Sequence, residues 1–338
     1  MPPPGLAGSG VDIRRDGPAG RVRLARPAAM NALDLPMIRA IAAALEGWRG
    51  DPRVEIVLIE AEGRAFCAGG DVRAARDWAR ASDDATIRAY FAAEYALDAA
   101  IASCPKPVVS LIDGVCMGGG VGLSVHGLAR IATPAAMFAM PETAIALFPD
   151  VGMTHVLGAM PGGLGLFLGL TGHRLPGADA VHAGLATHLV ERDALPDLAA
   201  ALVRDGIAAL PPVGALPPFS LAAHLPMIER CFTASDATGI VSRLAREDGE
   251  FAAAALASLR AASPAAVAWS FAAIRRGGGL TLPQAFAAEL ELACRVTRHP
   301  DFAEGVRAVL VDKDRCPAWR DAAIEAVDPA MVAAMLAG

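Results

Sequence analysis

The sequence predicts an α/β core followed by a helical C-terminal region. Strand and helix signals alternate between about residue 10 and residue 195, and the strand signals fade after about residue 196. A proline-dense segment at 210–226, LPPVGALPPFSLAAHLP, separates the two regimes. We therefore divide the chain near residue 200, into a core over 10–200 and a helical region over 201–338.

Each element of the core has its own signal. Residues 21–26 alternate between polar and apolar side chains, and residues 54–61 form a β-branched run of strand length. Between these two predicted strands, residues 35–51 place apolar side chains from Met37 to Trp48 on one face of a helix. Further signals predict a strand over 106–115, a helix over 120–129, and short strands over 130–133 and 137–140.

The C-terminal region has helical spacing and much alanine, which favours helix. Helices are predicted over 197–210, 250–263 and 283–298.

Composition excludes several classes of protein. With 54% hydrophobic and 20% charged residues the chain is not disordered, and a net charge of −6 argues against a nucleic-acid or anionic-membrane partner. The Pro/Gly-rich start, residues 1–10, lacks the features of a secretory signal, and no later window holds eighteen uninterrupted apolar residues. These features predict a soluble, cytoplasmic protein. Its six cysteines show no metal-ligand spacing, so we expect buried, reduced thiols.

A first glycine loop, GRAFCAGGD at 63–71, follows a strand and precedes a predicted helix at 72–80. Gly69 and Gly70 let the backbone approach a ligand and leave N–H groups exposed at a helix start, while Asp71 can cap that helix. Taken alone, the segment also reads as an ordinary strand-to-helix turn.

A second glycine loop, MGGGVG at 117–122, follows the strand at 106–115. Two such loops at neighbouring strand ends would aim two amides at one oxygen, as in an oxyanion hole. A dinucleotide fingerprint is the alternative, but the third glycine positions are Leu123 and Val125, so G-x-G-x-x-G is absent.

Two acidic residues, Glu142 and Asp150, lie eight positions apart in the otherwise apolar AMPETAIALFPDVG at 139–152. Ionised side chains are rarely buried without a partner, because their desolvation is costly. The two acids therefore serve either as surface caps or in the chemistry of a site.

Four motifs together resemble the crotonase (enoyl-CoA hydratase/isomerase) superfamily, most closely its 3-hydroxyisobutyryl-CoA hydrolase branch. They are RPAAMNAL, AFCAGGD, MGGGVGLSVHG and FAMPETAIALFPDVG, and the later DFAEGVRAVLVDKDRCPAW is similar to that branch too. The resemblance covers roughly residues 20–320. It implies the crotonase spiral, in which strand–strand–helix turns stack into two roughly perpendicular sheets, here followed by the helical region.

The resemblance also implies an acyl-CoA site. The two oxyanion amides of the family fall on Gly70 and Gly119, with Gly69 beside the substrate, and one catalytic glutamate of the hydratases matches Glu142. The second hydratase glutamate falls on Gly122. Since adding water to a double bond is thought to need two carboxylates, classical hydration is disfavoured.

The hydrolase branch shares that glycine and has an acid that matches Asp150, while Glu94 matches a substrate-contacting glutamate. Basic residues near Lys313 contact the phosphates of the coenzyme in relatives. As alternatives, Asp150 is an N-cap of the following helix, Glu142 an exposed loop residue, and Glu94 and Lys313 surface residues. Met153 is bulkier than the residues usual in relatives and would narrow the acyl pocket.

The function implied by the resemblance is hydrolysis of a short hydroxyacyl-CoA, 3-hydroxyisobutyryl-CoA above all, which belongs to valine catabolism. Glu142 would act as nucleophile or general base, and Asp150 would bind the substrate hydroxyl or transfer a proton. No metal or redox cofactor is implied, because coenzyme A is part of the substrate. A homo-oligomer is compatible with the alanine-rich helices.

Two alternatives stay open at this point. One is an enoyl-CoA hydratase or isomerase, and the other is a catalytically silent acyl-CoA-binding protein.

Overall fold

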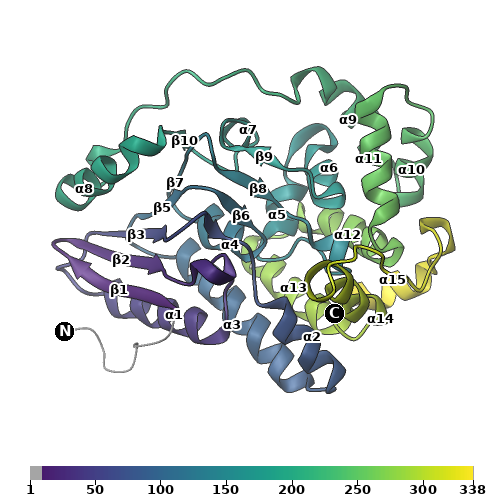
Figure 1. Cartoon of the computed structure of the whole chain (residues 1–338), viewed down its shortest axis with the longest axis horizontal. Helices are drawn as coiled ribbons and strands as arrows, with labels where there is room; N and C mark the ends of the chain where they lie inside the picture. The colour runs from purple at the N-terminus through teal and green to yellow at the C-terminus, as the bar shows by residue number, and fades with distance from the viewer. Residues whose placement is uncertain (1–9, 338) are drawn as a thin grey trace. The chain divides into compact units, whose positions relative to one another are not determined.

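The computed structural model describes residues 10–337, so the predicted N-terminal tail lies almost entirely outside the described residues (Figure 1). Contacts divide the chain into two compact units. Unit 1 comprises the chain up to Gly70, Ala93–Phe138 and Arg174–Ser220, and unit 2 comprises Asp71–Ala92, Ala139–His173 and Leu221 onward. This division differs from the boundary predicted near residue 200, because two segments of the predicted core pack with the C-terminal helices.

Unit 1 contains a six-stranded sheet among the described residues, in the order β1-β2-β3-β5-β7-β10. The first pair is antiparallel and the remaining pairs are parallel. Since parallel strands buried on both faces are continuous apolar runs, β3 and β5 match the runs predicted from the sequence. The strands are β1 (Val11–Asp16), β2 (Ala19–Leu24), β3 (Ile56–Ala61), β5 (Val108–Ile112), β7 (Ala129–Ala132) and β10 (His188–Leu189).

Helices cover both faces of this sheet (Figure 1). On one face, Leu202 of α8 (Leu195–Asp205) packs into a core cluster with Ile56 and Leu58. On the opposite face lies α1 (Leu35–Arg49), where the Trp48 ring contacts Gly20 of β2. Successive residues of a strand point to opposite faces of the sheet. Because helices cover both faces, the side chains of β3 are apolar on both.

A smaller sheet, four-stranded within residues 10–337, has the order β4-β6-β8-β9. The strand predicted over 106–115 is in fact two strands, β5 and β6, because a turn at Gly114 with φ +72° separates them. The strands are β4 (Ala65–Cys67), β6 (Val115–Met117), β8 (Met137–Ala139) and β9 (Leu175–Pro176).

The described part of the chain contains no strand after β10, so the helical character of the C-terminal region is confirmed. The sequence analysis did not predict the helices α3, α6, α7, α9, α10, α12, α14 and α15, whose bounds follow. Unit 1 also holds α4 (Gly119–Val125) and α7 (Gly177–His182), and α3 (Asp84–Ala102) is divided between the units. Unit 2 holds α2 (Val72–Arg80), α5 (Met153–Gly158), α6 (Leu164–Thr171), α9 (Leu225–Phe232), α10 (Ala237–Leu244), α11 (Glu250–Ala261), α12 (Pro264–Gly277), α13 (Leu282–Val296), α14 (Pro300–Val306) and α15 (Pro329–Leu336).

Between residues 10 and 337, no single helix has the length and apolarity needed to cross a membrane. The helices α11 and α12 taken together are long and apolar enough, but the chain bends by 108° between them.

Candidate active site

The two glycine loops of unit 1 leave the small sheet at the same edge, because β4 and β6 are parallel neighbours. Gly69 has φ +117° and Gly118 has φ +50°, backbone conformations that favour glycine. A Cβ placed on Gly69 would lie 3.9 Å from Gly119 N, and one placed on Gly119 would lie 3.4 Å from Gly70 N. The structure therefore brings the two predicted amides together.

The segment Met30–Leu33 holds the first loop in place. Leu33 N donates to Gly69 O at 2.9 Å, and Ala68 N donates to Met30 O at 3.0 Å. Gly70 itself pairs with Leu33 in a β-bridge. Because Gly119 is the first residue of α4, its N–H has no acceptor within that helix.

Asn31, in the RPAAMNAL motif, connects this segment to the rest of unit 1. Its side chain is fully buried, donates to Glu62 O at 2.9 Å and Ala65 O at 2.8 Å, and accepts from Arg26 N at 2.8 Å. Sequence reasoning quoted the motif without assigning Asn31 a role. The motif thus has a structural role: Asn31 fixes the segment that holds the loop carrying Gly70.

Glu94 lies beside these amides, since a Cβ on Gly119 would overlap its Oε1 atom. Its side chain is buried, so the interpretation of Glu94 as a solvated surface residue is wrong. Asp98 follows one helical turn later on α3 and is equally buried. Sequence reasoning missed Asp98, although two acids four positions apart in an apolar helix are a visible signal.

The thiols next to the loops are poor nucleophiles. Burial raises the pKa of Cys67 to about 12 and also raises the pKa of Cys116, so both stay protonated at neutral pH. No group of metal-binding residues occurs in the part of the chain that the structure describes. All cysteines are free, but only three are buried, so the prediction of buried thiols is wrong for Cys104, Cys294 and Cys316.

In unit 2, Glu142 is buried at the start of a short 3-10 helix, Glu142–Ile145. Leu147 N donates to Glu142 O at 3.0 Å, and Trp269 Nε1 of α12 donates to Leu147 O at 3.1 Å. Thr143 Oγ1 donates to Leu170 O at 3.1 Å. The turn is held on two sides, and the interpretation of Glu142 as an exposed loop residue is wrong.

Asp150, also buried, precedes a turn in which Val151 has φ +54° and Gly152 has φ +81°. The N-cap of α5 is Gly152, so the interpretation of Asp150 as the N-cap is wrong. A different carboxyl group binds this helix start: Glu289 of α13 accepts from Gly152 N at 2.6 Å and from Thr154 N at 3.0 Å. Sequence reasoning missed Glu289, because an acid in an alanine-rich helix is normally exposed.

Burial raises the pKa of Glu289 from 4.5 to about 8, and the charge of Asp150 adds to this effect. Between these pH values the folded chain binds more protons at Glu289 than the unfolded chain does, so stability should fall as the pH rises from 4.5 to about 8. Glu289→Gln should remove this contribution. Urea unfolding of both proteins across this range checks it, and identical pH slopes would contradict the shifted pKa.

Two further predicted residues lie in unit 2. Met153, the first residue of α5, is fully buried. Lys313 is exposed and has φ +59°, while its neighbours Asp312 and Asp314 each bind Arg307 at 2.6 Å. An exposed Lys313 is compatible both with a contact to coenzyme phosphates and with a surface residue.

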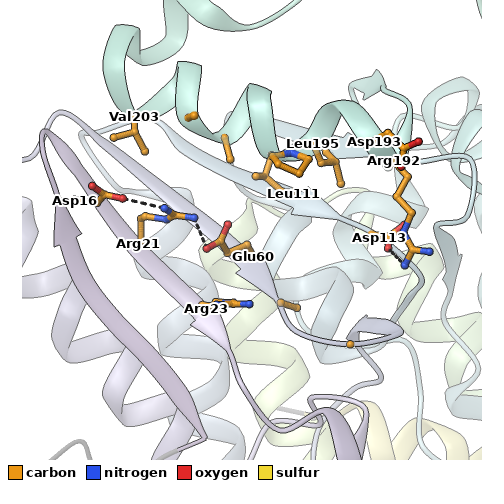
Figure 2. Close-up of a pocket in the computed structure, with 15 residues that line it drawn as sticks. Asp16, Arg21, Arg23, Glu60, Leu111, Asp113, Arg192, Asp193, Leu195 and Val203 are labelled. Carbon is orange, nitrogen blue, oxygen red and sulfur yellow. Dashed lines mark hydrogen bonds and ion pairs between the residues drawn. The ribbon is translucent and has the colours of Figure 1, made fainter.

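A pocket of about 850 Å³ opens between α8 and the large sheet of unit 1 (Figure 2). Arg21 binds Asp16 at 2.9 Å and Glu60 at 2.6 Å, and Arg192 binds Asp113 at 2.5 Å. None of the predicted site residues lines this pocket. Because four acidic residues line it against three arginines, the pocket is a weak candidate for an anionic substrate.

Solved structures with this fold define the class. An enoyl-CoA hydratase from Rhodobacter sphaeroides 2.4.1 matches with a TM-score of 0.93 and 44% identity, covering 97% of each chain. A carnitinyl-CoA dehydratase from Mycobacterium thermoresistibile matches with a TM-score of 0.91 and 36% identity, covering 97% of this chain and 96% of the other. The predicted crotonase fold is confirmed.

A sequence model described as enoyl-CoA hydratase/isomerase matches residues 19–336, and this chain belongs to that family. Among curated relatives, the mitochondrial 3-hydroxyisobutyryl-CoA hydrolase of Gallus gallus is 42% identical over 336 residues, which is 95% of this chain and 87% of the relative. The Homo sapiens protein of the same name is 40% identical over 331 residues, 94% of this chain and 86% of the relative.

Proposed function

We propose that this chain hydrolyses the thioester of a short hydroxyacyl-CoA, 3-hydroxyisobutyryl-CoA above all, to the free acid and coenzyme A. One observation favours hydrolysis over hydration among the activities of this family. Where hydratases have their second glutamate, this chain has Gly122, a buried residue of α4 that offers no carboxylate for water addition. The names of the curated relatives support hydrolysis, whereas the two solved structures are described as a hydratase and a dehydratase.

The proposed chemistry uses amides from both glycine loops and both buried acids, Glu142 and Asp150. Glu142 attacks the thioester carbonyl or activates a water that does so, and the Gly70 and Gly119 amides stabilise the oxyanion. The C–S bond then breaks, and the coenzyme A thiolate takes up a proton. Where Glu142 itself attacks, the resulting anhydride between Glu142 and the acyl group is hydrolysed by one water, which releases the acid and restores the Glu142 carboxylate. Where Glu142 activates a water, that water attacks directly, so either route consumes one water. Asp150 binds the 3-hydroxyl group or transfers a proton.

Three further residues would bind the substrate. Gly69 and Glu94 contact the acyl-thioester end, because Glu94 Oε1 lies beside Gly119. Lys313 contacts the phosphates of the coenzyme. Met153, a bulkier residue than is usual in relatives at this position, narrows the acyl pocket.

Hydrolysis changes no oxidation state, so the proposed reaction needs no redox cofactor. In this proposal Glu142 and the two amides supply the activation, without a metal. We place it in the cytoplasm as a step of valine catabolism, whereas the curated relatives are named as mitochondrial. We expect no nucleic-acid or membrane partner and leave a homo-oligomer open. Fractionation of the source cells tests the location, and sedimentation tests the oligomeric state.

A free-thiol assay on a panel of acyl-CoA compounds tests the function. Release of thiol, fastest from 3-hydroxyisobutyryl-CoA, supports the proposal. A loss of enoyl absorbance without thiol release would show a hydratase or isomerase instead. Binding of acyl-CoA with neither change would show a silent binding protein.

Asp150→Asn tests whether the second acid binds the substrate hydroxyl. If it does, we expect kcat/KM to fall on 3-hydroxyisobutyryl-CoA by about 10-fold or more, since a hydrogen bond to a charged group contributes about 1.5–3 kcal/mol. The loss should shrink on isobutyryl-CoA, which lacks that hydroxyl. Equal losses on both substrates would favour proton transfer, and no loss on either would exclude Asp150 from the site.

A further inference from the structure

We propose that Glu289 is a positioning residue for Asp150: its carboxyl group binds the backbone at the start of α5 and thereby fixes the turn that carries the Asp150 side chain. The inference rests on the proposed function, because it gives Asp150 a role in turnover. All the residues concerned lie in unit 2.

Three donors from the start of α5 converge on the Glu289 carboxyl group. Gly152 N donates to Oε2 at 2.6 Å, and Thr154 N and Thr154 Oγ1 donate to Oε1 at 3.0 Å and 2.5 Å. Glu289 and Thr154 are almost completely buried, so water does not replace these bonds. Hydrogen bonds to an ionised carboxylate are stronger than neutral ones, and a hydroxyl group can also accept from the protonated acid. The contact with Thr154 therefore persists in both protonation states.

The turn needs such an anchor. Val151 is β-branched and has φ +54°, a left-handed conformation that is rare and unfavourable for such a residue. Conformations of this kind persist where the surroundings over-determine them, and they gather at functional sites. Met153 N donates to Asp150 O at 2.8 Å, which closes the turn, and Glu289 fixes the residues on the far side of Val151. Releasing Glu289 would let Val151 relax and would move Asp150.

Charged and titratable groups on α13 and on its neighbours include Arg88 of α3, which binds Glu291. Asp150 is the charged group that acts on Glu289, and burial together with this charge raises the pKa of Glu289 to about 8. His155 is the titratable side chain of α5, and α15, which also packs against α13, carries none. On α13 itself, Glu291 and Arg295 form an ion pair with each other.

The test compares Glu289→Gln with Glu291→Gln on the same helix. Glutamine places an NH₂ group, which cannot accept, opposite either Gly152 N or Thr154 N. At least one of these two hydrogen bonds is therefore lost. Glu291 binds Arg88 and Arg295 at the surface and serves as the matched control. We expect Glu289→Gln to lower kcat by about 10-fold or more with KM nearly unchanged, because a small displacement of a reacting group is costly. Glu291→Gln should stay within about twofold, as exposed ion pairs contribute little.

A double-mutant cycle separates positioning from a merely structural role. In an Asp150→Asn background, Glu289→Gln should lower kcat by less than about twofold, because residues that act as a unit have non-additive effects. Losses that multiply would overturn the proposal. Should Glu289→Gln not fold, Thr154→Val replaces it in the same cycle, since it removes only the hydroxyl donor.

Amide hydrogen exchange at Gly152 and Thr154 provides a readout that needs no turnover. Exchange should be faster in Glu289→Gln than in Glu291→Gln, and equal rates would overturn the proposal. If the unaltered protein releases no thiol from any acyl-CoA, the proposed function fails, and the exchange rates still decide whether Glu289 anchors the turn.

Discussion

Glu142→Gln should lower kcat for 3-hydroxyisobutyryl-CoA by at least ~10²-fold, the size expected when a general base or nucleophile is lost. Glutamine keeps the side-chain volume but cannot accept a proton or attack a carbonyl group. Folding should survive, because the bond from Leu147 N uses the backbone oxygen of residue 142. The measurement is steady-state thiol release, with a thermal unfolding curve for each protein.

Glu46→Gln on the exposed face of α1 is the matched control for the same chemical change. Its kcat should equal that of the unaltered protein. If the thioesterase activity of Glu142→Gln is close to that of this control, the proposed mechanism is contradicted, whatever the thermal unfolding curves show.

Gly119→Ala should reduce kcat by up to about 10²–10³-fold, the effect of one lost oxyanion donor, because alanine keeps the N–H group but displaces it. The added Cβ would overlap Glu94 Oε1 and lie 3.4 Å from Gly70 N, in the space that a thioester oxygen needs. Either Glu94 or the loop must shift, and both belong to the proposed site. Single-turnover thiol release checks the chemical step directly.

Gly47→Ala is the control for this substitution, since a Cβ there meets nothing within 4 Å. Gly47 lies within α1, so alanine should stabilise the protein by about 0.5–1 kcal/mol and leave kcat unchanged. A Gly119→Ala protein as active as this control would show that the second loop does not bind the reacting oxygen.

Strands and helices with strong periodicity could be predicted from the sequence. The helix expected at 72–80 is α2, and the run at 54–61 contains β3 (Ile56–Ala61). The boundary between β5 and β6 was hidden, because Asp113 and Gly114 interrupt an apolar run that reads as one strand. Helix α3 was missed as an element, although it carries both Glu94 and Asp98.

The predicted site residues came from motifs, and motifs contain only residues that are close in sequence. Glu289 shows the limit, because its partners Gly152 and Thr154 precede it by 137 and 135 positions. No local pattern connects residues so far apart. Asn31 is the opposite case, because it lies in a motif that the sequence shows. Its role could not be predicted, since its three hydrogen bonds depend on where Glu62 and Ala65 lie in the fold.

The order of synthesis on the ribosome has consequences for a chain whose compact units are interleaved. All segments of unit 1 have been made once residue 220 has been translated. Helix α6, by contrast, is apolar on all sides and is completed at Thr171, well before its packing partners α9 and α12 exist. If translation pauses after Thr171 and before α9 and α12 have been made, α6 is exposed to water. Exposed apolar surface promotes aggregation. The yield of native protein therefore depends on how quickly the last third of the chain follows.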